Sequence, residues 1–177
     1  MEKEGFKRVD KINYYLDIAE TVAERGTCYR KNYGSVIVKN DELISTGYTG
    51  SPRGRVNCID LGYCIRRKLF PDATGGNRFD LCRSVHSEMN AIISCSRKDM
   101  MGSSLYMVGK YSDDPKYNKK LAGTYAKDPD CCHFCKRLII NSGIEKVYIR
   151  VSKKEYKIIN VSDWINTDEL LEGKVGY

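Results

Sequence analysis

Long hydrophobic runs are absent from this sequence. The longest aliphatic stretches are 36–38 and 138–140, whereas a membrane-spanning helix needs about 20 apolar residues. The first eight residues, Met-Glu-Lys-Glu-Gly-Phe-Lys-Arg, contain no apolar segment of the kind found in secretory signal peptides. We therefore expect a cytoplasmic protein that neither spans nor enters a membrane.

Internal repeats, low-complexity tracts and interdomain linkers are also absent. With 41% hydrophobic residues, the chain can bury a core, so we expect one domain over 1–177 with its core at about 10–157. Cysteine accounts for eight residues of 177, below the roughly 8–10% typical of small disulfide-built domains. In a reducing compartment, such cysteines point to metal binding or catalysis.

The positive charge is concentrated in one segment. The net charge is +7, and residues 97–157 carry 14 basic and 7 acidic side chains. This excess suits an anionic partner, either a phosphorylated small molecule or a nucleic acid. A solvated basic face without a partner explains the same composition.

The periodicity of apolar residues predicts an α/β fold. A helix is expected at 10–25, a hairpin of two strands at 35–38 and 43–48, and a further helix and strand at 86–96 and 104–108. A helix at 132–141 followed by a strand at 146–151 predicts a right-handed parallel crossover. The sheet should therefore be mixed.

Three segments lack this periodicity. Residues 50–82 should be loop-rich, with at most one short helix near 65–70. Residues 109–130 are polar and indicate an insertion or lid. The tail, 158–177, offers only a short acidic helix at 167–172.

Two clusters at predicted helix N-termini carry residues suited to chemistry, His86-Ser87-Glu88 and Cys132-His133-Phe134-Cys135. The positive end of a helix stabilises the thiolates that Zn²⁺ requires. His86, Cys132 and Cys135 would leave the fourth tetrahedral position open to water, as in catalytic zinc sites. Glu88, two residues from His86, would then serve as the proton carrier rather than as a ligand. Either cluster alone is less specific, since Cys-x-x-Cys also occurs in redox pairs and structural zinc sites.

These clusters resemble the signature of the zinc-dependent nucleotide deaminases, H-x-E followed by P-C-x-x-C. Within that group, residues 86–92 are similar to the H-A-E-x-N-A-I of the deoxycytidylate deaminases, residues 47–54 to their G-Y-N-G-x-P-x-G loop, and residues 139–144 to their I-I-x-S-G-I turn. The resemblance covers about 27–150. It implies a three-layer α/β/α fold of the cytidine deaminase type with a five-stranded mixed sheet, and zinc-dependent conversion of dCMP to dUMP and ammonia.

The resemblance also implies substrate contacts. Arg30 corresponds to a basic residue near the 5′-phosphate, and Tyr48 and Ser51 belong to the glycine loop that could contact the nucleotide. Thr49 stands where the family has an asparagine that helps to hold the sugar. Cys131 stands in place of the proline before the first zinc cysteine, and the spacing to Cys135 still favours Cys132 as the ligand.

A second, structural zinc is implied by cysteines similar to those of some deoxycytidylate deaminases. It would crosslink the loop-rich segment through four cysteines: Cys28, Cys58, Cys64 and Cys82. The same residues could instead be reduced, buried thiols. Cys95, beside Ile92, should fill the core.

Some family members form hexamers that dCTP activates and dTTP inhibits, so a homo-oligomer and these effectors are further implications. Two other functions fit the residues. One is the same zinc chemistry on cytidine, on a pterin or flavin precursor, or on a base in nucleic acid. The other is a zinc-stabilised, non-catalytic nucleic-acid-binding module, which would have no use for Glu88 beside an open metal position.

Overall fold

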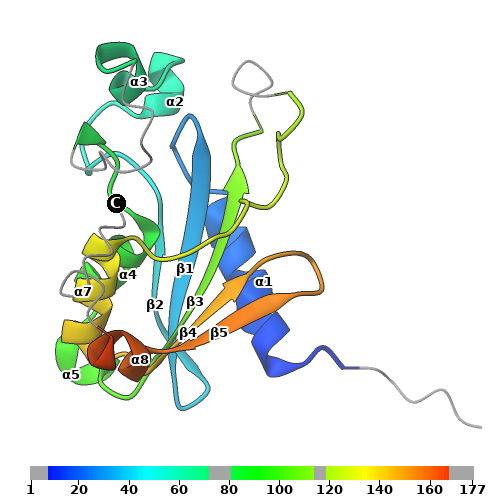
Figure 1. The fold of residues 1–177 in the computed structure, drawn as a ribbon, viewed down its shortest axis with the longest axis vertical. Coiled ribbons are helices and arrows are strands. Elements are labelled where there is room, and N and C mark those ends of the chain that lie inside the picture. Colours follow the sequence, from blue (N-terminus) through cyan, green and yellow to red (C-terminus); the bar gives the residue numbers. More distant parts are fainter. Residues whose placement is uncertain (1–7, 72–80, 114–118, 168–177) are drawn as a thin grey trace, which may run out of the picture.

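The structure, a computed structural model, describes residues 8–71, 81–113 and 119–167. Its centre is a five-stranded sheet in the order β2-β1-β3-β4-β5 (Figure 1). The strands are β1 (Lys31–Lys39), β2 (Glu42–Tyr48), β3 (Ser104–Tyr111), β4 (Lys146–Arg150) and β5 (Tyr156–Asn160). Only the β3–β4 pair is parallel, so the predicted mixed sheet is confirmed.

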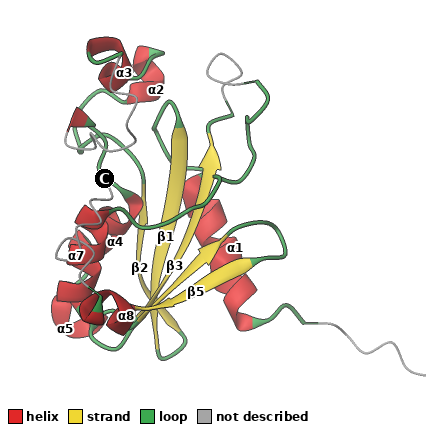
Figure 2. Cartoon of the chain, in the orientation of Figure 1, coloured by secondary structure: helices red, strands yellow, loops and turns green. Residues whose placement is uncertain are grey.

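Helices cover both faces of the sheet (Figure 2). One face packs against α1 (Lys11–Ala23), and the other against α4 (Ser87–Ile93), α5 (Arg97–Met100), α7 (His133–Ser142) and α8 (Val161–Asn166). The alternation of side chains along β1 separates the two cores: Val36 and Val38 face α1, and Ile37 faces α4 and α7. Because both faces are covered, the middle of β1 is buried without interruption.

The elements confirm most of the sequence predictions and correct two. The described part of 50–82, which leaves out 72–80, has two short helices where at most one was expected, α2 (Cys58–Leu61) and α3 (Ile65–Leu69). In the tail, β5 and α8 were not predicted. The acidic helix expected at 167–172 lies almost wholly outside the described residues.

The insertion leaves the sheet at the end of β3 and returns to it. Tyr111 donates its backbone N–H to Thr124, and Ala126 donates to Gly109. From there the chain runs to the start of α7 (Figure 1). Over the described residues, the helices are too short and too polar for any of them to cross a membrane.

Candidate metal centre

The two predicted motif clusters meet where α4 and α7 begin. His86 is the N-cap residue of α4, and Cys132 is the N-cap residue of α7. The two helices lie side by side on one face of the sheet (Figure 1). Cys135 follows Cys132 by three residues, so both thiols face the same side of the first turn of α7.

The three side chains converge. His86 Nδ1 lies 3.4 Å from Cys132 Sγ and 3.5 Å from Cys135 Sγ, and all three ligand atoms lie within 4.8 Å of one another. Tetrahedral Zn²⁺, with Zn–N near 2.0 Å and Zn–S near 2.3 Å, needs donors about 3.5 Å apart. The donor set therefore fits zinc. Within the described residues it is the single group of three or more His, Cys, Asp or Glu side chains that could hold a metal ion.

The environment of the three groups favours charge separation. Hydrogen bonds from Cys135 and His86 lower the pKa of Cys132, while the bond to Cys132 and burial raise the pKa of Cys135. Burial alone would lower the pKa of His86, but its bond to Cys132 and the negative charges of Glu88 and Cys132 together outweigh burial and raise that pKa. Zinc binding requires neutral His and ionised Cys, so we expect it to release protons.

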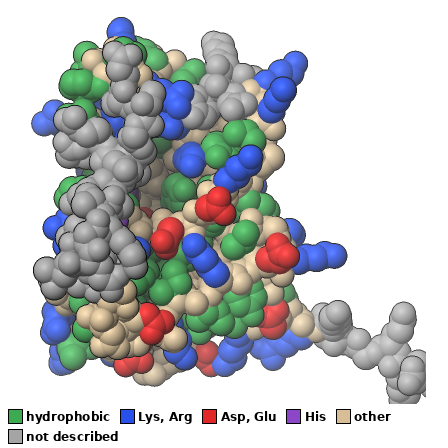
Figure 3. Space-filling view, viewed as in Figure 1, with side chains coloured by type: hydrophobic (Ala, Val, Ile, Leu, Met, Phe, Trp, Pro, Cys, Tyr) green, Lys and Arg blue, Asp and Glu red, His purple; other side chains and the backbone are tan. Residues whose placement is uncertain are grey.

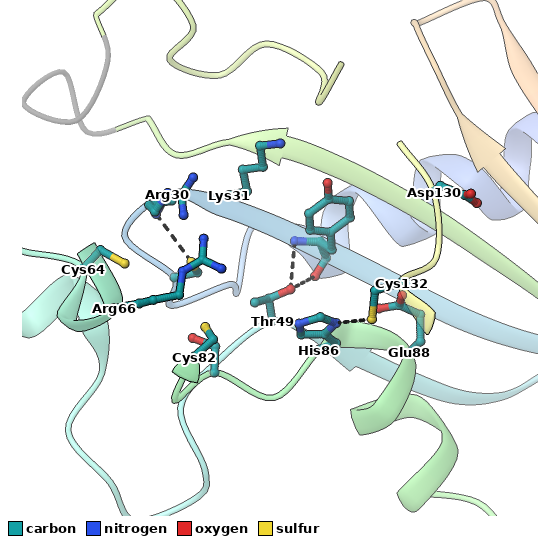
Figure 4. A pocket seen from close by; sticks show the side chains of 13 residues that line it. Arg30, Lys31, Thr49, Cys64, Arg66, Cys82, His86, Glu88, Asp130 and Cys132 are labelled. Carbon is teal, nitrogen blue, oxygen red and sulfur yellow. Dashed lines mark hydrogen bonds between the residues drawn. The ribbon is translucent and has the colours of Figure 1, made fainter. Parts of the chain in front are cut away.

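Glu88 lies beside this centre without belonging to the ligand group (Figure 4). It is the second residue of α4, and its side chain is buried, with 4% exposed. Its Oε2 accepts a hydrogen bond from Ser87 Oγ at 2.9 Å. A buried carboxylate next to a three-ligand metal site is placed to exchange protons with a molecule bound there.

A cavity of about 270 Å³ is lined by His86 and Cys132 of the centre and by Glu88, and its volume is close to the lower end of the range for small-molecule sites. Figure 4 shows Arg30 and Arg66 at the end away from Glu88 and Cys132. The cavity is therefore basic at one end and holds the metal ligands at the other. Its full lining is Cys28, Arg30, Lys31, Tyr33, Thr49, Cys64, Arg66, Cys82, Ser84, His86, Glu88, Asp130 and Cys132.

Two of the four predicted substrate residues, Arg30 and Thr49, line this cavity. Thr49 Oγ1 is engaged with the backbone of Tyr33, 3.2 Å from its nitrogen and 3.4 Å from its oxygen. Tyr48 is 38% exposed and does not line the cavity. Ser51 also lies outside the lining, and its buried Oγ has no hydrogen-bond partner among the described residues.

Sequence analysis did not single out Tyr33, Arg66, Ser84 or Asp130, which also line the cavity. Arg66 belongs to the basic run 66–68 in α3, and such a run by itself indicates only a charged surface. Its place in the cavity depends on the tertiary position of α3, which brings Arg66 into the same lining as Lys31. No local pattern in the sequence carries that information.

The four cysteines of the predicted structural zinc site lie at or near the same cavity. Cys28, Cys64 and Cys82 line it, and the buried Cys58 places its Sγ 3.9 Å from Ser84 Oγ. Burial raises the pKa of Cys28, and the neighbouring thiols of Cys82 and Cys58 raise it further. Over the described residues, these four do not form a group within ligand distance. Cys131 and Cys95 both pack in the core beneath α4 and α7.

Comparison with known proteins agrees with this geometry. Residues 9–151 match the family model for the cytidine and deoxycytidylate deaminase zinc-binding region. The deoxycytidylate deaminase of Mycobacterium phage D29 is 33% identical over 146 residues, which cover 79% of this chain and 94% of that protein.

Solved structures show the same fold. The dCMP deaminase of cyanophage S-TIM5 in complex with dCMP and dUMP superposes with a TM-score of 0.51 at 21% identity, covering 81% of this chain and 84% of that one. Cytidine deaminase from Burkholderia pseudomallei gives a TM-score of 0.51 at 13% identity, with coverages of 85% and 92%. With a His, Cys, Cys centre that fits zinc, a matching family model over most of its length and the same α/β architecture, this chain belongs to the cytidine and deoxycytidylate deaminase family of zinc hydrolases.

Proposed function

We propose that this protein catalyses the hydrolytic deamination of dCMP to dUMP and ammonia. The observation that carries the proposal is the cavity that joins a three-ligand metal centre, a buried carboxylate and two arginines. The choice of dCMP is supported by the relative from phage D29, a deoxycytidylate deaminase, and by the S-TIM5 enzyme, which was crystallised with dCMP and dUMP.

The residues divide the chemistry between them. Zn²⁺ held by His86, Cys132 and Cys135 would lower the pKa of a coordinated water to about 7. Glu88 accepts a proton from the attacking water and delivers it to N3 of the cytosine ring as a C4–O bond forms. A second proton passes through Glu88 to the exocyclic nitrogen, the C4–N4 bond breaks, and ammonia leaves.

The basic end of the cavity suits the 5′-phosphate. Arg30 comes from the segment before β1, Arg66 from α3, and Lys31 opens β1. Guanidinium groups bind phosphate oxygens in a bidentate manner. We therefore expect the protein to prefer the monophosphate to the nucleoside.

A nucleic-acid substrate is the alternative that the charge distribution keeps open. In Figure 3 the charged side chains seen in the upper part of the face are Lys and Arg, and acidic side chains appear among basic ones in the lower part. Ammonia release from dCMP, CMP, deoxycytidine, cytidine and a cytosine-containing oligonucleotide separates these functions. Highest kcat/KM on dCMP supports the proposal, and highest kcat/KM on another substrate reassigns it. No release from any of them excludes these five substrates and leaves a pterin or flavin precursor or a non-catalytic module.

A structural zinc on Cys28, Cys58, Cys64 and Cys82 is a second part of the proposal. It is supported by three of these residues lining one cavity, although binding would need the four thiols to move closer together than they are here. Elemental analysis of the purified protein decides the point. Two zinc ions per chain are expected, and one would exclude this site.

Regulation and assembly are proposed from the family resemblance. A second cavity, lined in part by Pro52, Arg53 and Asn90, lies at the 47–54 loop, where an effector triphosphate could bind. Velocity curves with and without dCTP and dTTP, together with the mass in solution, test both points. Unresponsive hyperbolic kinetics and a monomeric mass would exclude them.

A further inference from the structure

A chain of buried hydroxyl groups stands behind Glu88. Ser87 Oγ lies 2.9 Å from Glu88 Oε2, and Ser35 Oγ lies 2.8 Å from Ser87 Oγ. Both serines are fully buried, Ser35 in the interior strand β1 and Ser87 at the start of α4. A buried hydroxyl is costly unless it is hydrogen-bonded, so these contacts restrict all three side chains.

The number of hydrogens fixes the direction of the chain. A serine hydroxyl has one hydrogen, and an ionised carboxylate can only accept. Ser87 therefore donates to Glu88, and Ser35 must donate to Ser87. The bond to the carboxylate is charge-assisted, which makes it the stronger of the two.

The two carboxylate oxygens of Glu88 are consequently not equivalent. Oε2 is held by Ser87, whereas Oε1 accepts no hydrogen bond from the residues that the structure describes. Glu88 also lines the cavity. One oxygen is thus anchored to the sheet, and the other is left for a molecule in the cavity.

We infer that Ser87 is a positioning residue for the deamination, with Ser35 in support. It fixes the Glu88 carboxylate through Oε2, so that Oε1 is the oxygen that carries protons between water and the cytosine ring. The inference rests on the role proposed for Glu88. Ser87 stands where the resembled H-A-E motif has alanine, so Ser87→Ala should fold while losing only the hydroxyl.

The test compares Ser87→Ala with a matched control, Ser45→Ala. Ser45 is also buried and also hydrogen-bonds to α4, through Ala91 O at 2.6 Å, but it does not touch Glu88. We expect Ser87→Ala to lower kcat by about tenfold, with KM for the substrate and the zinc content unchanged. Ser45→Ala should keep kcat within about twofold of the wild type. We expect it to lower thermal stability about as much as Ser87→Ala does, because each variant loses one buried hydrogen bond.

A double mutant separates positioning from general damage. If Ser87 acts only through Glu88, adding Ser87→Ala to Glu88→Gln should cause no further loss. The inference would be overturned if Ser87→Ala lowered kcat further in the Glu88→Gln protein. It would also be overturned if Ser87→Ala alone had a wild-type kcat or changed only KM. If Ser87→Ala does not fold, Ser35→Ala should show a smaller loss of kcat in the same direction, and no loss there would overturn it equally.

The outcomes distinguish this inference from the proposed function. Zinc-loaded wild type that releases ammonia, together with an inactive Glu88→Gln, upholds the function whatever Ser87→Ala does. An active Glu88→Gln would remove the role proposed for Glu88 and this inference with it, while the function would still rest on the ammonia that the wild type releases. The assay uses whichever substrate of the panel the wild type turns over best.

Discussion

At the scale of single residues, the site depends on which of two adjacent cysteines faces the metal. Cys132 caps α7 and approaches His86, whereas Cys131 is buried in the hydrophobic core. The backbone N–H of Cys131 donates to Asp130 Oδ1 at 2.9 Å, which helps to fix how the chain enters α7. The neighbouring thiols therefore have different functions although their chemistry is the same.

We predict that Cys132→Ser abolishes zinc binding at the centre, because it removes one of the three ligands. Cys131→Ala is the control, and it should keep both zinc and activity while losing about 1 kcal/mol of stability. Metal content of the two purified variants measures this directly. Equal zinc in both, or loss of the metal in Cys131→Ala instead, would reverse the assignment.

Much of the centre could be predicted at this scale because its residues are fixed by local geometry. Cys132 and Cys135 are one helical turn apart, and that spacing is visible in the sequence. Cys132 and Cys135 lie 46 and 49 residues after His86 in the sequence, and these separations do not by themselves indicate that the three side chains meet. Arg66 and Asp130 reach the cavity only through the tertiary fold, so sequence reasoning missed them.

At the scale of elements, close packing of α4 on the sheet positions His86 and Glu88. A Cβ atom added to Gly47 in β2 would lie 2.3 Å from the backbone at both Ala91 and Ser87. Gly34 allows α1 an equally close approach on the opposite face, since its Cβ would lie 2.1 Å from Ala19 O. Glycine is needed at both positions because the neighbouring atoms belong to the backbone.

We predict that Gly47→Ala and Gly34→Ala each destabilise the fold by about 2 to 3 kcal/mol. Only Gly47→Ala should also lower kcat in the folded protein, because it displaces the helix that carries Glu88. Thermal unfolding and kcat of both variants are the measurements. Equal activity in the two folded variants would show that the packing of α4 does not control the site.

A buried arginine joins β4 to α1. Arg150 is 1% exposed, and its Nη1 donates to Asp17 at 2.7 Å and to Glu20 at 3.1 Å. Burial alone would raise the pKa of Asp17, but the hydrogen bonds and charges of Arg150 and Lys153 together outweigh burial and lower that pKa. For Glu20 the opposing groups are Tyr125 and Lys110, whose hydrogen bonds lower its pKa against the effect of burial.

We predict that Arg150→Met lowers the free energy of unfolding by about 2 to 3 kcal/mol at pH 7, because Asp17 and Glu20 lose the positive charge of their buried partner. Because the pKa values of Asp17 and Glu20 are lowered in the folded protein, these carboxylates stabilise the fold at pH values above their ordinary pKa values of 3.8 and 4.5. This stabilisation is lost as the pH falls through their pKa values in the folded protein. The difference between variant and wild type should therefore shrink towards pH 3. Unfolding curves at pH 7 and pH 3 measure it, and a difference that grows at low pH would contradict this explanation.

At the scale of the whole molecule, the central elements were predictable because each buries a continuous face. The edge strand β5 was missed because none of its residues is fully buried, so its hydrophobic periodicity is weak. The short helix α2 was missed because it buries only one residue, whereas α3 (Ile65–Leu69) is the short helix predicted near 65–70. Their position at the cavity depends on long-range contacts.

We propose that Glu88 carries the protons of the deamination in the cavity that His86 and Cys132 also line. The most direct test is ammonia release from dCMP by wild type and Glu88→Gln, each assayed at measured zinc content. We predict equal zinc at the His86, Cys132, Cys135 centre and a loss of at least about 100-fold in kcat for the variant. Substantial turnover by zinc-loaded Glu88→Gln would contradict the account.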